Sequence, residues 1–167
     1  RKTGNTRSLT NLEKMGMDLF FSDRTKCSTC HSGSNFSAPD GPFDAYGGGG
    51  MSGSGDLGGA ANIGLDLVYK DNGRGNGRFK IPSLRNIALT APYMHDGRFK
   101  TLEEVIDHYS HGIKPHTHLD PKFTDGKGNV VHPNYTSLEK QALVAFLKTL
   151  TDQEMIRDPK YSNPFKK

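Results

Sequence analysis

Two cysteines and the histidine that follows them constrain this chain more than any other feature. Cys27 and Cys30 are the only cysteines in 167 residues, two other residues separate them, and His31 follows directly. Cys-x-x-Cys-His is the pattern of covalent haem attachment. Two thiols on one turn can reach the two vinyl groups of a porphyrin and become thioethers, while the next imidazole is carried beneath the iron. The pattern predicts one haem c, bound through Cys27 and Cys30, with His31 as the proximal iron ligand.

Two other interpretations of this motif remain open. A dithiol redox pair is typical of a strand-to-helix junction in an α/β fold, which the surrounding sequence does not predict. A structural zinc ion would use both thiolates and a histidine, and only His116 and His118 could add a closely spaced second pair of ligands. Haem is favoured over both alternatives.

The composition agrees with a bound prosthetic group. Only 33% of the residues are hydrophobic, there is no Trp, and 20 residues are glycine, so side chains alone would make a thin core for a single domain of residues 1–167. No apolar run approaches the roughly 20 residues of a membrane-spanning helix. The 22 basic and 18 acidic residues are spread along the chain and leave a net charge of +4, which argues against nucleic-acid binding.

Three segments have the pattern of amphipathic helices: 10–21, 101–111 and 136–150. Each begins with a Thr followed three residues later by Glu, the spacing of a capping box, and continues with apolar residues at helical intervals. Between them, nine of the eighteen residues in 47–64 are glycine, which predicts an irregular loop. The polar segment from 113 to 135 is expected at the surface, and 155–167 as a tail. We therefore expect an all-α domain with long irregular loops around one haem.

The sixth iron position has two candidates. Met94 offers a soft thioether from a compact turn between the haem motif and the last helix, and chemistry alone favours it. Tyr109, on the inner face of the second predicted helix, is the competitor. Lys80 and Arg85 lie in the dense segment near the predicted haem and are candidate propionate contacts, or else ordinary surface cations.

Four segments in this order resemble the C-terminal haem domain of bacterial dihaem cytochrome c peroxidases and the related MauG proteins. They are Leu19-Phe20-Phe21-Ser22 followed by the haem motif, Phe79-Lys80-Ile81-Pro82-Ser83-Leu84-Arg85-Asn86, Leu89-Thr90-Ala91-Pro92-Tyr93-Met94-His95-Asp96-Gly97, and Thr101-Leu102-Glu103-Glu104. The resemblance implies a cytochrome c-like helical domain, periplasmic or otherwise exported, whose haem passes electrons to a peroxidatic haem in another domain. It also implies redox partner proteins or a larger haem-protein complex.

The resemblance carries over to single residues. Tyr109 matches the family's distal ligand, eight residues past Thr101, a position that is Met in the peroxidases and Tyr in MauG. The resemblance therefore favours Tyr109 over Met94, and over a sixth position that is open or ligated by His. The carbonyls of Thr90 and Pro92 match positions that help to hold a calcium ion between the two haems. Their partner Asn belongs to the family's other domain, so calcium is a weaker expectation than haem.

The sequence leaves two main functions. One attachment motif favours a monohaem cytochrome, or cytochrome domain, for periplasmic electron transfer. The alternative is the electron-entry half of a dihaem peroxidase or MauG-like enzyme. A complete peroxidase is not expected from this chain alone, because it has one haem motif and no Trp to bridge two haems.

Overall fold

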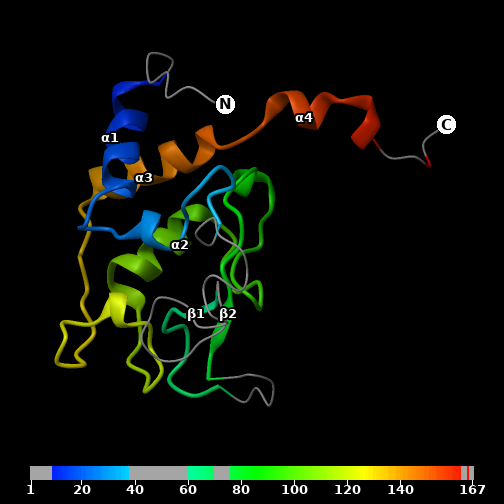
Figure 1. The fold of residues 1–167 in the computed structure, drawn as a ribbon. Helices are drawn as coiled ribbons and strands as arrows, with labels where there is room; N and C mark the ends of the chain where they lie inside the picture. The colour runs from blue at the N-terminus through cyan, green and yellow to red at the C-terminus, as the bar shows by residue number, and fades with distance from the viewer. Residues whose placement is uncertain (1–8, 38–59, 70–75, 163–164, 166–167) are drawn as a thin grey trace.

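The structure, a computed structural model, describes residues 9–37, 60–69, 76–162 and 165. Within these residues, four α-helices and two strands are connected by turns and short helical segments (Figure 1). The α-helices are α1 (Asn11–Phe20), α2 (Leu102–Asp107), α3 (Ser137–Thr149) and α4 (Gln153–Arg157), and the strands are β1 (Ala60–Asn62) and β2 (Arg78–Lys80). A π-helical turn, His108–Gly112, continues α2, and 3-10 turns span Cys27–Thr29, Ile87–Leu89, Pro121–Phe123 and Pro159–Tyr161.

The three predicted helices form α1, α2 with its π-helical turn, and α3. Each starts at the predicted threonine, Thr10, Thr101 or Thr136, and all three capping boxes are complete. Such a box satisfies backbone N–H groups at the helix start that have no partner within the helix. The helix starts were therefore encoded locally.

The fold is helix-rich, but it is not purely helical. β1 and β2 pair as a two-stranded antiparallel sheet (Figure 1). In its register Ala61 lies opposite Phe79. Residues 60–62 belong to the segment 47–64 that was expected to be irregular, and for these residues the prediction was wrong. The buried Asn62 side chain explains the order there, because it accepts from the Gly64 backbone N–H at 2.9 Å and donates to the Asn76 carbonyl at 2.6 Å. Residues 47–59 lie outside the described residues.

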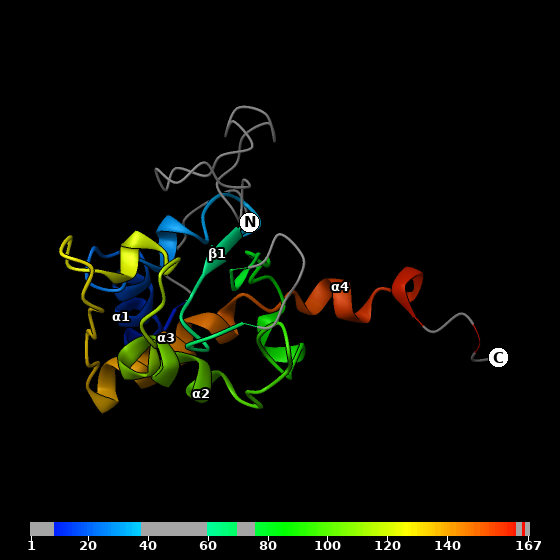
Figure 2. The ribbon, with the colours of Figure 1, turned by 90° about the horizontal axis from the view of Figure 1, so that it is seen from below.

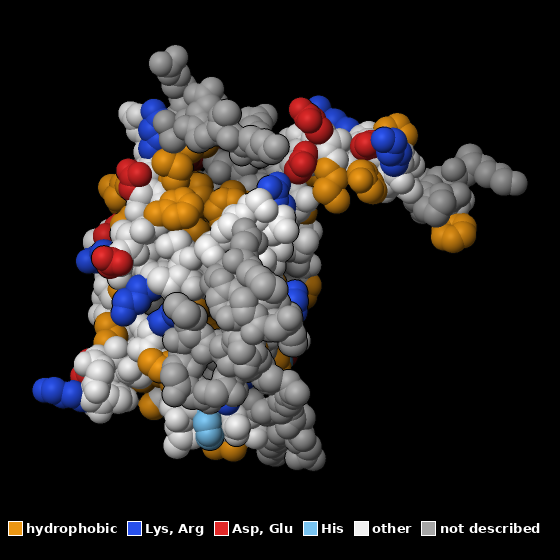
Figure 3. All heavy atoms as spheres, viewed as in Figure 1, with side chains coloured by type: hydrophobic (Ala, Val, Ile, Leu, Met, Phe, Trp, Pro, Cys, Tyr) orange, Lys and Arg blue, Asp and Glu red, His pale blue; other side chains and the backbone are white. Residues whose placement is uncertain are grey.

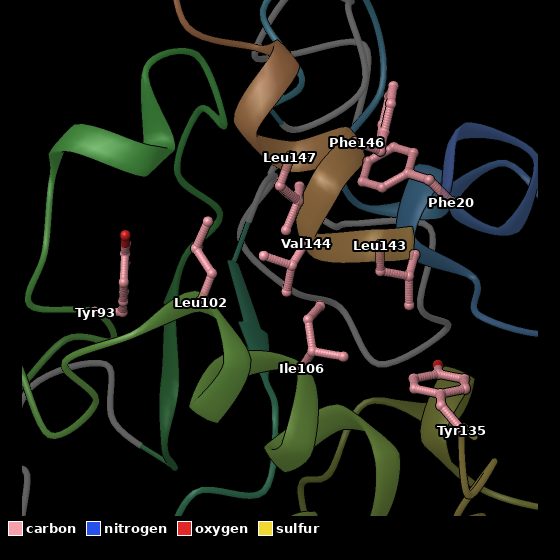
Figure 4. Packing of buried hydrophobic residues seen from close by; sticks show 9 residues of the cluster. All are labelled: Phe20, Tyr93, Leu102, Ile106, Tyr135, Leu143, Val144, Phe146 and Leu147. Carbon is pink, nitrogen blue, oxygen red and sulfur yellow. The ribbon is translucent and has the colours of Figure 1, made fainter. Parts of the chain in front are cut away.

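The core lies between α1, α2 and α3. Figure 4 shows Leu102 and Ile106 of α2 facing Leu143, Val144 and Leu147 of α3, with Phe20 of α1 beside Phe146. Gly16 of α1 is buried against α3, where a Cβ at this position would lie 1.9 Å from the Ala142 carbonyl oxygen. The missing side chain allows the two helices to approach closely.

The chain continues past α3 into an arm that leaves the body (Figures 1 and 2). The predicted tail overlaps α4, where Met155 and Ile156 are about half exposed, and Figure 3 shows hydrophobic side chains on this arm. None of the helices in the described part of the chain is long and apolar enough to cross a membrane.

Candidate haem-binding site

A cavity of about 390 Å³ opens beside the core and brings together most of the predicted site residues. Its volume falls within the range of about 300–1,000 Å³ that is usual for ligand and cofactor sites. Core side chains from α1, α2 and α3 form part of the wall, and several of them appear in Figure 4. The predicted haem-site residues that line it are Cys27, Cys30, His31, Lys80, Met94 and Tyr109.

The attachment motif is folded into one tight turn. The 3-10 turn Cys27–Thr29 starts after Lys26, whose φ of 55° reverses the chain, and the backbone N–H of His31 donates to the Cys27 carbonyl at 2.9 Å. Both thiols are free and half-buried. Burial raises the pKa of the Cys27 thiol to about 11 and also raises the pKa of Cys30. Reactive redox cysteines have lowered pKa values, so this environment does not favour a dithiol redox pair.

His31 is oriented by the loop that follows it. Its Nδ1 lies 3.1 Å from the Phe36 carbonyl oxygen, which can only accept, so Nδ1 carries the proton. Burial lowers the pKa of His31, against the opposing effect of the Phe36 and Pro82 carbonyls, and favours the neutral imidazole. The lone pair is then on Nε2. A backbone acceptor on the second ring nitrogen is the usual support of a histidine that ligates a metal.

Tyr109 reaches the cavity from the π-helical turn that follows α2. Its ring packs beside Phe123, with the ring centroids 6.0 Å apart. Tyr109 is half-buried, and no hydrogen bond joins its hydroxyl to another of the described residues. Burial raises the pKa of Tyr109 well above the usual 10, so the phenol stays protonated unless a positive charge such as a metal ion approaches. The arrangement suits an iron ligand.

Met94 remains the alternative sixth ligand. It is half-buried, lines the cavity, and has the left-handed φ of 72° in the turn after Tyr93. Tyr93 holds this turn in place, because its hydroxyl donates to the Ile87 carbonyl at 2.9 Å and its backbone pairs with Phe99. Thr90 and Pro92, whose carbonyls the resemblance assigns to calcium, also line the cavity.

The two predicted propionate contacts have different positions. Lys80, at the end of β2, is exposed and lines the cavity. Arg85 is not among the cavity-lining residues, and its Nε and Nη2 donate to the Ser34 carbonyl at 2.9 and 2.6 Å. Arg85 therefore ties its segment to the loop after the haem motif. Lys26, which the sequence interpretation did not single out, also lines the cavity and donates to the Lys122 carbonyl at 3.2 Å.

The expectation that 113–135 lies at the surface was wrong in part. Ile113, Leu119 and Asp120 are buried, and Phe123 reaches the cavity beside Tyr109. Isolated apolar residues in this polar segment were the available signal, but they have no helical or strand period. Ile63 and Leu65, just beyond the glycines, line the cavity as well and were also missed.

Zinc gains no support from the described part of the chain. No three His, Cys, Asp or Glu side chains there are close enough together to hold a metal ion. Nδ1 of His116 is already bonded to the Asn62 side-chain amide at 3.0 Å and to the His118 backbone N–H at 3.0 Å.

No protein-family model matches the chain, but comparison with known proteins identifies cytochrome-c peroxidases and MauG proteins as relatives. Cytochrome-c peroxidase IdrP2 of Pseudomonas sp. (strain SCT) is 39% identical over 101 residues, which cover 59% of this chain and 24% of the relative. Methylamine utilization protein MauG of Paracoccus denitrificans (strain Pd 1222) is 40% identical over 92 residues, 47% of this chain and 24% of the relative.

A solved structure matches nearly the whole chain. It is the crystal structure of a MauG-like protein associated with microbial copper homeostasis, with a TM-score of 0.71 and 36% sequence identity. The match covers 96% of this chain and 53% of that protein, so this chain spans about half of its length. These likenesses, together with the Cys-x-x-Cys-His turn in the cavity, show that the chain is related to the dihaem cytochrome c peroxidase and MauG family.

Proposed function

We propose that this chain is one haem c domain of an exported dihaem peroxidase or MauG-like oxidoreductase, and that it accepts electrons from a redox partner and passes them to a second haem. The observation that carries the proposal is the shared cavity of Cys27, Cys30, His31 and Tyr109. The match to about half of a MauG-like structure supports a place within a larger haem protein.

Each of the cavity residues would have a different role in holding the haem. Cys27 and Cys30 would form the two thioethers, and Nε2 of His31 would take the proximal iron position. Haem bound there supplies one-electron oxidation and reduction. The Phe36 carbonyl keeps His31 in the ligating tautomer. The apolar walls would exclude water from a bound haem, and Lys80 at the cavity edge would pair with one of its propionates.

Tyr109 is the proposed sixth ligand. Its hydroxyl has no hydrogen-bond partner in the described part of the chain, and burial raises its pKa, so a nearby positive charge such as a bound iron would be needed to favour the phenolate. A hard phenolate favours ferric iron and lowers the reduction potential, whereas the Met94 thioether would raise it. We therefore expect a domain of low potential.

The first experiment tests haem and ligand together. The chain is matured with a haem-attachment system, and its mass and absorption spectrum are measured. We expect the added mass of one haem and a Soret band, both lost when Cys27 and Cys30 are replaced by alanine. Tyr109→Phe should change the ferric spectrum and raise the potential, while Met94→Leu should leave both unchanged. Colourless protein with the mass of the polypeptide alone would refute haem binding.

A free-standing electron-transfer cytochrome is the second candidate, because this sequence holds a single attachment motif. The two functions differ in the haem content of the complete gene product. If the chain belongs to a dihaem enzyme, mass spectrometry of the complete gene product should find two covalent haems. That product should also turn over hydrogen peroxide or oxidise a substrate. The chain alone should show a six-coordinate haem that is inert to cyanide and peroxide. A complete product with one inert haem would favour the cytochrome.

A further inference from the structure

His108 lies directly beside Tyr109, the proposed iron ligand. It directly precedes Tyr109, begins the π-helical turn His108–Gly112, and is only 6% exposed. A π-helical turn contains one residue more than an α-helical turn, is rare, and often occurs at functional sites. The wider turn changes the direction in which its side chains point, so contacts from outside the helix must hold it.

The imidazole of His108 supplies such a contact. Its Nε2 lies 2.9 Å from the carbonyl oxygen of Ile63, so Nε2 carries the proton and donates. Ile63 lies in the segment just after β1 and lines the cavity that also contains Tyr109. The bond therefore joins the turn that carries Tyr109 to the segment of Ile63, 45 residues away in the sequence.

The other sides of the imidazole are packed against the turn itself. The ring lies edge to face with Tyr109, with centroids 5.3 Å apart and an interplanar angle of 69°. The Phe99 ring also packs against the imidazole, with the two ring centroids 5.8 Å apart. At Gly112 a Cβ would lie 3.3 Å from Nδ1 of His108, so the end of the turn closes tightly on the imidazole. A movement of His108 would consequently move both the turn and the phenol.

We propose that His108 is a positioning residue for Tyr109. The hydrogen bond from Nε2 to Ile63 anchors the π-helical turn to the segment after β1, and the imidazole edge supports the phenol ring. Together they set the point in the cavity at which the Tyr109 hydroxyl lies. This inference rests on the proposed function, because it concerns the ligand of the haem.

The test compares haem-loaded variants by ferric absorption spectrum and midpoint potential. His108→Leu removes the donor while filling the space, and it should shift both in the direction of Tyr109→Phe, by at least half of that variant's change. His108→Gln keeps a donor and should restore much of the original behaviour. His111→Gln, at an exposed position of the same turn, is the matched control and should change neither. If His108→Leu does not fold, His108→Asn, too short to reach Ile63, takes its place.

The double variant separates positioning from a general effect on the pocket. In the Tyr109→Phe background, His108→Leu should add no further spectral change, and an additive change would overturn the proposal. An unchanged spectrum and potential in His108→Leu, with Tyr109→Phe clearly altered, would refute positioning and leave the ligand assignment intact. If neither variant changes the spectrum, the ligand assignment and the positioning role both fail.

Discussion

The crossing of α1 and α3 depends on Gly16, and replacing it with alanine should destabilise the protein. The new Cβ would lie 1.9 Å from the Ala142 oxygen, 2.5 Å from the Ala142 carbonyl carbon and 2.9 Å from the Cβ of Phe146. Ordinary contact begins at 3.4 Å, so α1 would have to move away by about 1.5 Å, the difference between 3.4 and 1.9 Å. The obstacle is backbone, which cannot rotate out of the way.

Two effects of opposite sign set the magnitude. Alanine is a better helix former than glycine by about 1 kcal/mol. Overpacking a core usually costs about 1–3 kcal/mol, and occasionally more. The clash with a backbone carbonyl places Gly16→Ala at or above the upper end of that cost, so the net loss should be about 2 kcal/mol. For a chain of this length that corresponds to a fall in Tm of about 4–8 °C.

Chemical and thermal unfolding of the haem-loaded protein, followed by far-UV circular dichroism, measure this loss. Asp18→Ala is the matched control, because it introduces alanine into an exposed position of the same helix. It should change the free energy of unfolding by less than about 0.5 kcal/mol. If Gly16→Ala were as stable as the parent, the close contact of α1 and α3 would be wrong.

Three other predictions follow from local contacts. Thr136→Ala should cost about 1 kcal/mol of unfolding free energy, because it removes the capping box of α3, while Thr136→Ser should retain most of the stability. Hydrogen bonds and charge from Arg98 lower the pKa values of Asp66 and Asp96. The two carboxylates therefore add to the free energy of unfolding above their unfolded-state pKa of about 3.9. This stabilisation disappears as the pH falls through their lower pKa values in the folded protein. Asp66→Asn should therefore flatten the loss of stability below about pH 4 in acid titrations. Phe123→Ala should let water reach Tyr109 and shift the ferric spectrum; an unchanged spectrum would remove Phe123 from the site.

Local signals in the sequence were enough for the helix starts and for the attachment motif. The residues of a capping box are three positions apart and act within one turn, so Thr10, Thr101 and Thr136 could be identified without the fold. Cys27, Cys30 and His31 likewise share one short turn. A site whose residues are close together in the chain can therefore be predicted from the sequence.

Contacts between distant segments needed the tertiary structure. The apolar residues in the polar segment after Gly112 have no helical or strand period, so they did not predict that Phe123 would reach the cavity. The glycine-rich composition before Ala60 likewise hid a strand that pairs with residues 78–80. The sequence could not distinguish the role of Arg85 from that of Lys80, because both are cations of the same segment, 79–86. Only the fold shows that the guanidinium bonds the Ser34 carbonyl.

The sequence by itself was enough to predict covalent haem attachment, since the two thiols and the imidazole lie within five consecutive residues. The tertiary structure decided which side chains share the cavity with that motif. It brought Tyr109 there on a π-helical turn 78 positions after His31, and it joined that turn to Ile63 through His108. The approach of these distant segments to one cavity depends on how α2 packs against α3 and against the segment after β1. No short stretch of sequence contains that information.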